Sequence, residues 1–393
     1  MNQRERAMLD PRRGRGIALS AFALSVAATA SACTPPMPPD VLAAQAESQI
    51  ECQTGSTDVS VPDNLFGAMT FVGDALTAVC PEQTLMEVGP QEPAKLKVVD
   101  GTPSPEDVSD FTAGCPAGDV IYVPLYSYPV TLAYNIFGLE GLVLTPDAVA
   151  GILTGSITSW EDPAITDANE GFDLSGLPDI EVYTVDQDRG SVQAMTTWLS
   201  EEAPQSWSDG TLERLPGNIP FGSSLEMSEE LAFMEGAVAI LPVFEAFNAF
   251  VPTAAFPVTY GDEGGAEEEL IAYPDDPQLA KIGSGAMALS VDDQGNIAAT
   301  PAVGGIPDDE IFDLAASKII LQEDQPVVGW PVLGTGHLLV CDDPADPLPL
   351  SVAQYALRLA GQGALETYGL TPLPEPVRIR TFEPLKVTVA QED

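Results

Sequence analysis

The chain has 393 residues, 45% of them hydrophobic, and carries 15 Lys and Arg against 59 Asp and Glu, a net charge of −44. This apolar fraction supports a large core and argues against wholesale disorder, and the length predicts two or three domains. The negative field repels polyanions, so we expect no nucleic-acid partner. A single histidine, His337, disfavours His-based zinc sites and a Ser-His-acid triad, and we expect no metal and no cofactor.

The N-terminal segment has the pattern of an export signal. Arginines in the first 15 residues precede an uncharged run of small and apolar residues over 17–32, which is short for a membrane span. The run ends in Ala30-Ser31-Ala32-Cys33, which resembles a bacterial lipobox. The sequence therefore predicts a lipoprotein signal peptide over 1–32, a lipid anchor on Cys33 at the extracytoplasmic face of the plasma membrane, and a Pro-rich tether over 33–44. The alternative is an ordinary cleavage site beside a cysteine.

Processing at Cys33 would make the chain more acidic. It would remove five of the 15 basic and two of the 59 acidic residues, leaving 10 basic and 57 acidic residues and a net charge of −47. The cysteines that remain besides Cys33 are Cys52, Cys80, Cys115 and Cys341. An even number in an exported protein predicts two disulfides, and the sequence leaves all three pairings open.

Short β-rich runs alternate with helical patterns, which predicts an α/β fold. In chain order the predicted elements are helix 64–79, strands 120–124 and 130–135, helix 146–153, strand 180–185, helices 192–202 and 228–234, strands 237–241 and 337–340, and helix 351–360. The helix from Pro146 has clear end signals, since Thr145 can cap its start and Gly155 can end it. The acidic runs 267–269 and 275–276 are interpreted as solvated loops.

The stretch 180–199 is the best candidate for chemistry, because it predicts a strand, a Gly-containing loop and a helix. Unpaired backbone N–H groups and the positive end of the helix dipole make such a loop an anion pocket. Arg189 adds a forked cation, Gly190 a close backbone approach and Ser191 a hydroxyl. The alternative is a capped surface turn in which Arg189 pairs with Asp186 or Asp188. The loop lacks the glycines of a nucleotide-binding motif.

The segment 134–169 resembles the signature of periplasmic phosphate-binding proteins of bacterial ABC importers. The residues that carry the resemblance are Tyr134, Asn135, Gly155, Ile157, Trp160, Asp162, Pro163 and Asn169. Further similarity in 180–199, 235–240, 329–340 and 368–377 extends it over roughly 120–380 with gaps. The resemblance implies a two-lobed, type II periplasmic-binding-protein fold with the ligand in an interlobe cleft. The implied lobe I is 45–128 plus 255–393, and lobe II is 129–254.

The resemblance also implies a ligand and partners. The ligand would be inorganic phosphate or a related oxyanion, held by Arg189, Gly190 and Ser191 and delivered to the membrane permease of an ABC importer by a monomer. Gly190 and Ser191 fall on a Gly and a Thr of the family's phosphate loop, whereas Arg189 falls where the family has Ser.

Lobe I departs further from the family. Its candidate ligand residues are Thr102, Ser104 and Thr112. The family's Asp that accepts the phosphate proton falls on Cys115 in this register, and a thiol is a poor acceptor. These departures favour one alternative, a degenerate family member that binds no anion and acts as a cell-surface interaction protein. The third candidate function is an exported hydrolase. The sequence has neither a nucleophile elbow nor an HExxH motif, so we expect no enzyme.

Overall fold

The structure is a computed structural model that describes residues 47, 49–115, 118–185, 189–216, 219–261, 267–274, 277–284, 287–300 and 328–387. The predicted signal peptide, the lipid-modified Cys33 and the tether lie outside these residues. Within the described ranges, no helix is both long and apolar enough to cross a bilayer.

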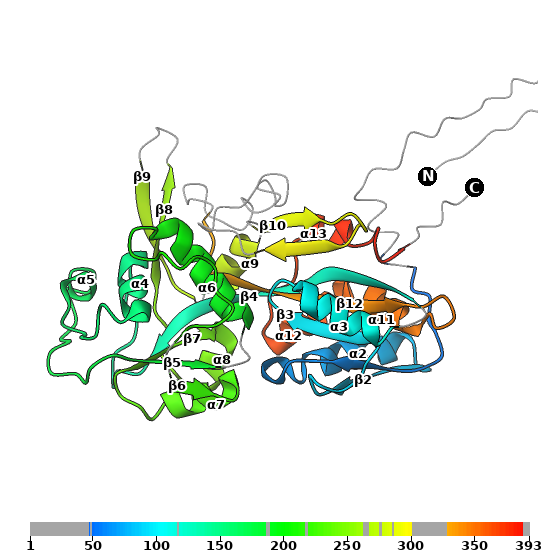
Figure 1. Cartoon of the computed structure of the whole chain (residues 1–393), viewed down its shortest axis with the longest axis horizontal. Helices are drawn as coiled ribbons and strands as arrows, with labels where there is room; N and C mark the ends of the chain where they lie inside the picture. The colour runs from blue at the N-terminus through cyan, green and yellow to red at the C-terminus, as the bar shows by residue number, and fades with distance from the viewer. Residues whose placement is uncertain are drawn as a thin grey trace, which may run out of the picture.

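One eight-stranded sheet runs through two lobes, in the order β2-β1-β3-β12-β4-β7-β5-β6 (Figure 1). Its strands are β1 (Gly55–Ser60), β2 (Gln83–Val88), β3 (Leu96–Asp100), β4 (Asp119–Tyr134), β5 (Glu181–Val185), β6 (Ile219–Phe221), β7 (Ala237–Pro242) and β12 (Leu333–Asp342). Two small antiparallel pairs are β8 (Phe256–Gly261) with β9 (Glu267–Ala272) and β10 (Ala288–Val291) with β11 (Ile297–Thr300). The predicted two-lobed α/β fold is therefore confirmed.

β4 is the strand that joins the lobes. Its first part, 119–129, pairs with β12 in lobe I, and its last part, 130–134, pairs with β7 in lobe II. The two strands predicted here are thus one continuous strand. The lobe boundaries proposed from the sequence, near residues 128 and 254, stay a prediction.

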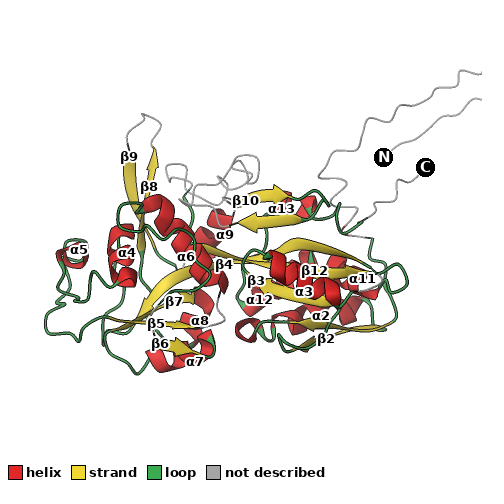
Figure 2. Ribbon diagram, in the orientation of Figure 1, coloured by secondary structure: helices red, strands yellow, loops and turns green. Residues whose placement is uncertain are grey.

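Helices cover both faces of the sheet (Figure 2). They are η1 (Asp63–Leu65), α2 (Ala68–Val79), α3 (Pro105–Ala113), α4 (Pro146–Thr154), α5 (Pro163–Thr166), α6 (Arg189–Glu202), α7 (Ser224–Leu231), α8 (Val243–Asn248), α9 (Pro277–Ser284), α11 (Leu348–Ala356), α12 (Leu359–Tyr368) and α13 (Glu375–Arg380). Alternate residues of one strand enter different cores, as the pleat requires. On β12, for example, Leu338 and Val340 join the large core, whereas Leu339 packs with Val99 and Phe111 beneath α3.

Several predicted helices differ in extent from those observed: the predicted 64–79 is η1 followed by α2 from Ala68, and α6 begins at Arg189 instead of residue 192. α7 begins at Ser224 instead of residue 228, because the Ser223 hydroxyl accepts a hydrogen bond from the Glu226 N–H and caps the helix there. The predicted helix 351–360 is two helices, α11 and α12. Arg358 lies between them with an extended backbone (φ −77°, ψ 161°), and its guanidinium donates to the Gln49 carbonyl oxygen at 2.5 Å.

The acidic run 267–269, predicted as a loop, forms the start of strand β9. It pairs with β8, and the Tyr260 hydroxyl donates to the Glu268 carboxylate at 2.8 Å. The charges are tolerated because Glu268 and Glu269 are exposed to water, whereas Phe256, Val258 and Ala272 of the same ribbon are buried. Residues 275–276, the second acidic run, lie outside the described residues.

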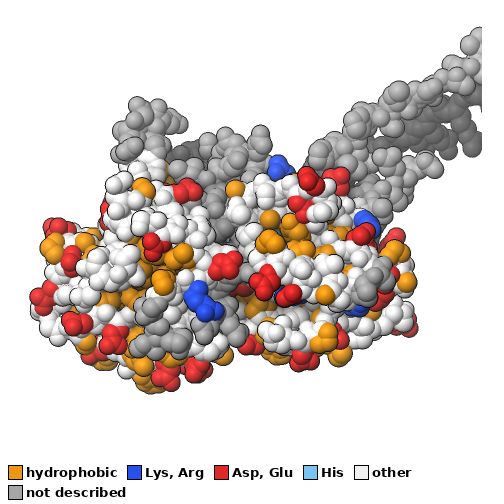
Figure 3. Space-filling view, viewed as in Figure 1, with side chains coloured by type: hydrophobic (Ala, Val, Ile, Leu, Met, Phe, Trp, Pro, Cys, Tyr) orange, Lys and Arg blue, Asp and Glu red, His pale blue; other side chains and the backbone are white. Residues whose placement is uncertain are grey.

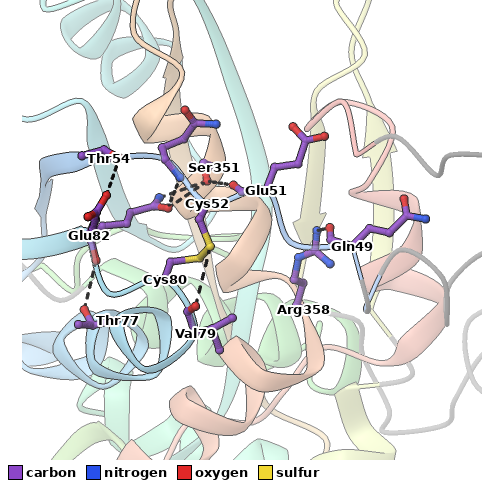
Figure 4. The surroundings of a disulfide bond; sticks show 12 residues. Gln49, Glu51, Cys52, Thr54, Thr77, Val79, Cys80, Glu82, Ser351 and Arg358 are labelled. Carbon is purple, nitrogen blue, oxygen red and sulfur yellow. Dashed lines mark hydrogen bonds between the residues drawn. A yellow bond between two sulfur atoms is a disulfide. The ribbon is translucent and has the colours of Figure 1, made fainter.

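The two predicted disulfides are present, and the structure selects one of the three pairings. Cys52 bonds to Cys80 at the end of α2, and Cys115 after α3 bonds to Cys341 on β12. Around Cys52 the chain is also hydrogen-bonded to the far end of the sequence, since the Ser351 hydroxyl donates to the Glu51 carbonyl oxygen at 3.0 Å (Figure 4). Both disulfides therefore belong to the part of the molecule built around β1–β3 and β12.

We expect the Cys115–Cys341 bond to contribute more stability than Cys52–Cys80. The first closes a loop with a sequence separation of 226 and the second one of 28. In the chain-entropy model, removing either costs about 2–5 kcal/mol, and the longer loop costs about 2 kcal/mol more. Denaturant unfolding of the two double-alanine variants measures this difference. Equal losses would contradict the expectation.

Candidate functional site

The parallel strands of both lobes end at one groove. β1 and β3 end at Ser60 and Asp100 in lobe I, while β6 of lobe II leads into Ser223 and Ser224. These residues line a cleft of about 550 Å³ between the lobes, which we call the interlobe cleft. Its polar lining comprises Ser60, Asp63, Asn64, Gln91, Lys97, Asp100, Asp107, Glu213, Arg214, Ser223 and Ser224. The carboxyl ends of parallel strands are the usual ligand-binding edge of α/β sheets.

Helix N-termini surround this cleft, because a helix follows each of β1, β3, β5, β6 and β7. Their dipoles favour an anion even where cationic side chains are scarce. Three of these helices are capped by the protein itself. Glu87 accepts from the Gly67 and Thr70 N–H groups at α2, Ser104 caps α3, and Ser223 caps α7. The start of α6 is the N-terminus that carries the Gly190-Ser191 pair predicted from the sequence.

The start of α6 lies directly against the end of β3. A Cβ atom on Gly190 would be 2.5 Å from both Asp100 Oδ1 and the Tyr128 hydroxyl oxygen. Tyr128, on β4, donates to Asp100 Oδ1 at 2.6 Å. One turn along α6, Gln193 Oε1 accepts from the Thr102 N–H at 3.2 Å. Lobe I and lobe II are therefore in contact here, and a carboxylate faces the anion-binding end of a helix.

Buried polar atoms gather around this contact. Among the described residues, several buried polar side-chain atoms near the cleft have no hydrogen-bond partner: Asn64 Nδ2, Tyr126 OH, Ser191 Oγ, Ser224 Oγ and both carboxyl oxygens of Glu245. Leaving such a group unsatisfied costs about 1–3 kcal/mol. A polar ligand with several oxygen atoms would satisfy donors of this kind together.

Burial keeps Glu245 in its neutral form near pH 7 and moves the pKa of the neighbouring tyrosines still further above neutrality. Burial, and then the charge of Asp100, raises the pKa of Tyr126 well above its usual value. Burial, and then the charges of Glu245 and Glu87, raises the pKa of Tyr368 to about 12. Burial raises the pKa of Glu245 to about 8, with Ser224 lowering it and the charge of Asp100 raising it. These neutral groups therefore surround Asp100 with O–H donors.

The predicted lobe II residues lie at the contact between α6 and the end of β3. Gly190 contacts Asp100, and Ser191 is fully buried in the first turn of α6. Arg189 is the first residue of α6, but its side chain is outside the described structure, as are Asp186 and Asp188.

The predicted lobe I residues are engaged elsewhere. The Ser104 hydroxyl caps α3 and donates to Asp107 at 2.7 Å, and the Thr112 hydroxyl donates to the Val108 carbonyl oxygen at 2.6 Å. The Thr102 hydroxyl donates to the Ala299 carbonyl oxygen at 3.5 Å, although its N–H reaches α6 through Gln193. Cys115 forms a disulfide with Cys341. It therefore cannot accept the phosphate proton in place of the family's Asp.

Asp100 is the lobe I residue that sequence reasoning missed. It is 6% exposed and ends a buried strand, and Gly101 and the capped helix α3 follow it. This strand–turn–helix pattern is the one recognised in 180–199, so it could have been found. His337 is fully buried beneath this turn, with Nδ1 2.8 Å from the Gly101 carbonyl oxygen and Nε2 accepting from the Ala299 N–H at 2.9 Å. Its role is structural.

The described residues contain no group of three or more His, Cys, Asp or Glu side chains that could hold a metal ion. No protein-family model matches the chain. Sequence comparison finds the phosphate-binding protein PstS 2 of Mycobacterium tuberculosis, 24% identical over 272 residues, which are 68% of this chain and 66% of that protein, just under two thirds of its length. The phosphate-binding protein PstS 3 of Mycobacterium leprae is 23% identical over 330 residues, 80% of this chain and 81% of that protein.

Solved structures agree on the fold. A human phosphate-binding apolipoprotein superposes with a TM-score of 0.55 and 13% identity, over 83% of this chain and 93% of that chain. A DING protein gives a TM-score of 0.54 and 15% identity over the same shares. The fold is shared with these proteins, and the resemblance to phosphate-binding proteins found in the sequence is confirmed.

Proposed function

We propose that the chain is an exported, lipid-anchored substrate-binding protein that holds inorganic phosphate, or a related tetrahedral oxyanion, in the interlobe cleft. It would deliver this ligand to the permease of an ABC importer. The observation that carries the proposal is the first turn of α6, where Gly190 lies against Asp100 across the lobe contact and the next residue, Ser191, is buried with a hydroxyl that has no partner among the described residues. The similar mycobacterial proteins described above are phosphate-binding proteins, which supports a binding role.

Each side chain has a distinct role in this proposal. The backbone N–H groups at the start of α6 and the hydroxyls of Ser191 and Ser224 donate to the ligand oxygens. The guanidinium of Arg189 adds charge. Asp100 can only accept, so it pairs with a ligand oxygen that still bears a proton. Phosphate near neutral pH has such an O–H group and sulfate does not, which gives the cleft a basis for discrimination.

The acidic surface does not prevent capture. Acidic side chains are spread over both lobes on the face shown in Figure 3, with few lysines or arginines among them. In salt, charges more than about 10 Å away are largely screened, whereas the donors in the cleft act at contact distance. The surface charge should instead slow the association of an anion, so added salt is expected to raise the association rate.

Titration calorimetry with phosphate, sulfate and a phosphonate tests the proposal. We expect phosphate binding in the wild type and an affinity about tenfold to a hundredfold lower in Ser191→Ala, because one hydrogen bond to a charged ligand is lost. Ser200→Ala is the matched control, since this hydroxyl on the same helix donates to the Thr196 carbonyl oxygen. A folded wild type with no heat and no melting shift at millimolar phosphate would refute the proposal and favour the non-binding surface protein.

A further inference from the structure

A buried acid at the cleft has no role in the mechanism above. Glu245 lies in the first turn of α8 and is 5% exposed. Among the described residues, neither of its carboxyl oxygens has a hydrogen-bond partner. Glu245 interacts with Ser224 and Asp100, and both of these residues line the interlobe cleft. The Ser224 hydroxyl lowers the pKa of this carboxyl, but neither carboxyl oxygen has a hydrogen bond of normal length among the described residues.

The groups that face Glu245 come from several elements. α8 packs on β4, β7 and α7. The end of β3 brings Asp100, which accepts from Tyr128 of β4 and whose charge raises the pKa of both Glu245 and Tyr126. α12 brings Tyr368, whose pKa Glu245 raises. β7 contributes only the uncharged residues 237–242, and α7 brings the Ser224 hydroxyl, close enough to lower the pKa of Glu245.

Charge decides which form of Glu245 this environment accepts. Two carboxylates, Asp100 and Glu245, share a buried region whose other facing groups are neutral hydroxyls. Ionising both is costly, so one of them holds a proton near pH 7, and burial assigns that proton to Glu245. A neutral carboxyl has an O–H donor, which suits an oxyanion, whereas the ionised form would repel it.

We propose that Glu245 contacts the bound oxyanion as a protonated, hydrogen-bond-donating carboxyl, and that loss of its proton weakens binding. Glu245 would then set an upper pH limit for ligand retention. This inference rests on the proposed function, and it goes beyond that function by making binding depend on a proton of the protein as well as on one of the ligand.

The sign of the pH dependence follows from linkage. Below pH 8 the empty site already holds the proton, so Glu245 adds no pH dependence to binding. Above pH 8 the ligand must bring a proton back with it, and affinity falls by up to about tenfold per pH unit. Glu245→Gln keeps an N–H donor and an acceptor but cannot ionise, so this part of the pH dependence disappears.

The experiment is phosphate titration calorimetry of the wild type, Glu245→Gln and the control Glu229→Gln, an exposed acid on α7, at pH 6.5 to 9.5. The ratio of wild-type to Glu245→Gln dissociation constants cancels the ionisation of phosphate itself. We expect this ratio to rise about tenfold between pH 8.5 and 9.5. Repeating the titrations in two buffers with different ionisation enthalpies should show proton uptake by the wild type at pH 9 that Glu245→Gln lacks. Parallel profiles and equal proton uptake would overturn the inference and leave the proposed function standing.

A ligand-free measurement gives a second, independent test. A carboxyl whose pKa is 4.5 in the unfolded chain and about 8 in the fold makes the protein less stable as pH rises between these values. The stability of Glu245→Gln relative to the wild type should therefore increase from pH 5 to pH 8 and then level off. A constant difference would overturn the inference. If the wild type binds no phosphate at any pH, the proposed function fails and the inference fails with it.

Discussion

Gly190→Ala is expected to abolish phosphate binding without unfolding the protein. The added Cβ would lie 2.5 Å from Asp100 Oδ1 and from the Tyr128 hydroxyl oxygen, far inside contact distance. Both neighbours are buried and hydrogen-bonded to each other, so α6 must move away from β3 to relieve the overlap. A shift of the anion-binding turn by a few tenths of an ångström weakens several hydrogen bonds together. We expect an affinity at least a hundredfold lower, about 3 kcal/mol, by calorimetry.

Gly363→Ala is the matched control for this prediction. Gly363 lies within α12, is exposed, and has open space where a Cβ would be placed. Alanine there should keep wild-type affinity and stabilise the fold by about 0.4–1 kcal/mol through the unfolded state. If Gly190→Ala binds phosphate within threefold of the wild type, the first turn of α6 is not the ligand site.

Asp100→Asn is expected to invert anion preference. The carboxylate can only accept a hydrogen bond, so it favours an anion that bears an O–H group and repels one that does not. An asparagine amide removes the charge and adds a donor. We expect phosphate affinity to fall at least tenfold. Sulfate affinity, expected to be low in the wild type, should rise by a similar factor. The reason is that a hydrogen bond with a charged group contributes about 1.5–3 kcal/mol.

Competition between phosphate and sulfate, followed by calorimetry, measures this change. Asp110→Asn, an exposed acid on α3, carries the same change of charge outside the cleft and should alter neither affinity. If Asp100→Asn changes the affinities for phosphate and sulfate equally, Asp100 acts only through its negative charge. If neither affinity changes, Asp100 does not contact the ligand.

The sequence predicted the features that depend on residues close together in the chain. Thr145 caps α4 and Gly155 ends it with φ 75°, as predicted, because both effects depend only on neighbours in the chain. The Gly190-Ser191 turn was recognised for the same reason. The four tryptophans, Trp160, Trp198, Trp207 and Trp330, lie in the core and are at most 3% exposed, as expected for large apolar side chains.

Tertiary contacts explain what the sequence could not predict. The pairing of Cys115 with Cys341 depends on α3 lying over β12, which no local pattern reveals. Asp100 becomes significant only because Tyr128 and α6 meet it from other parts of the chain. In the sequence, Glu245 cannot be told apart from any other acid in the first turn of a helix. It is buried only because α8 packs against α7 and β4 in the fold.

The sheet order also constrains the order in which the molecule can fold. β5, β6 and β7, with the helices between them, come from one unbroken stretch of chain, so these strands can pair before the C-terminal residues are made. The other half needs β12, α11 and α12 to complete the layer that β1–β3 begin, and these emerge last. An oxidase that acted too early would find Cys115 without Cys341, and Cys52 and Cys80 would be its nearest alternatives. Correct pairing of Cys115 therefore requires that its thiol stays reduced until the final sixty or so residues, which carry Cys341, are present.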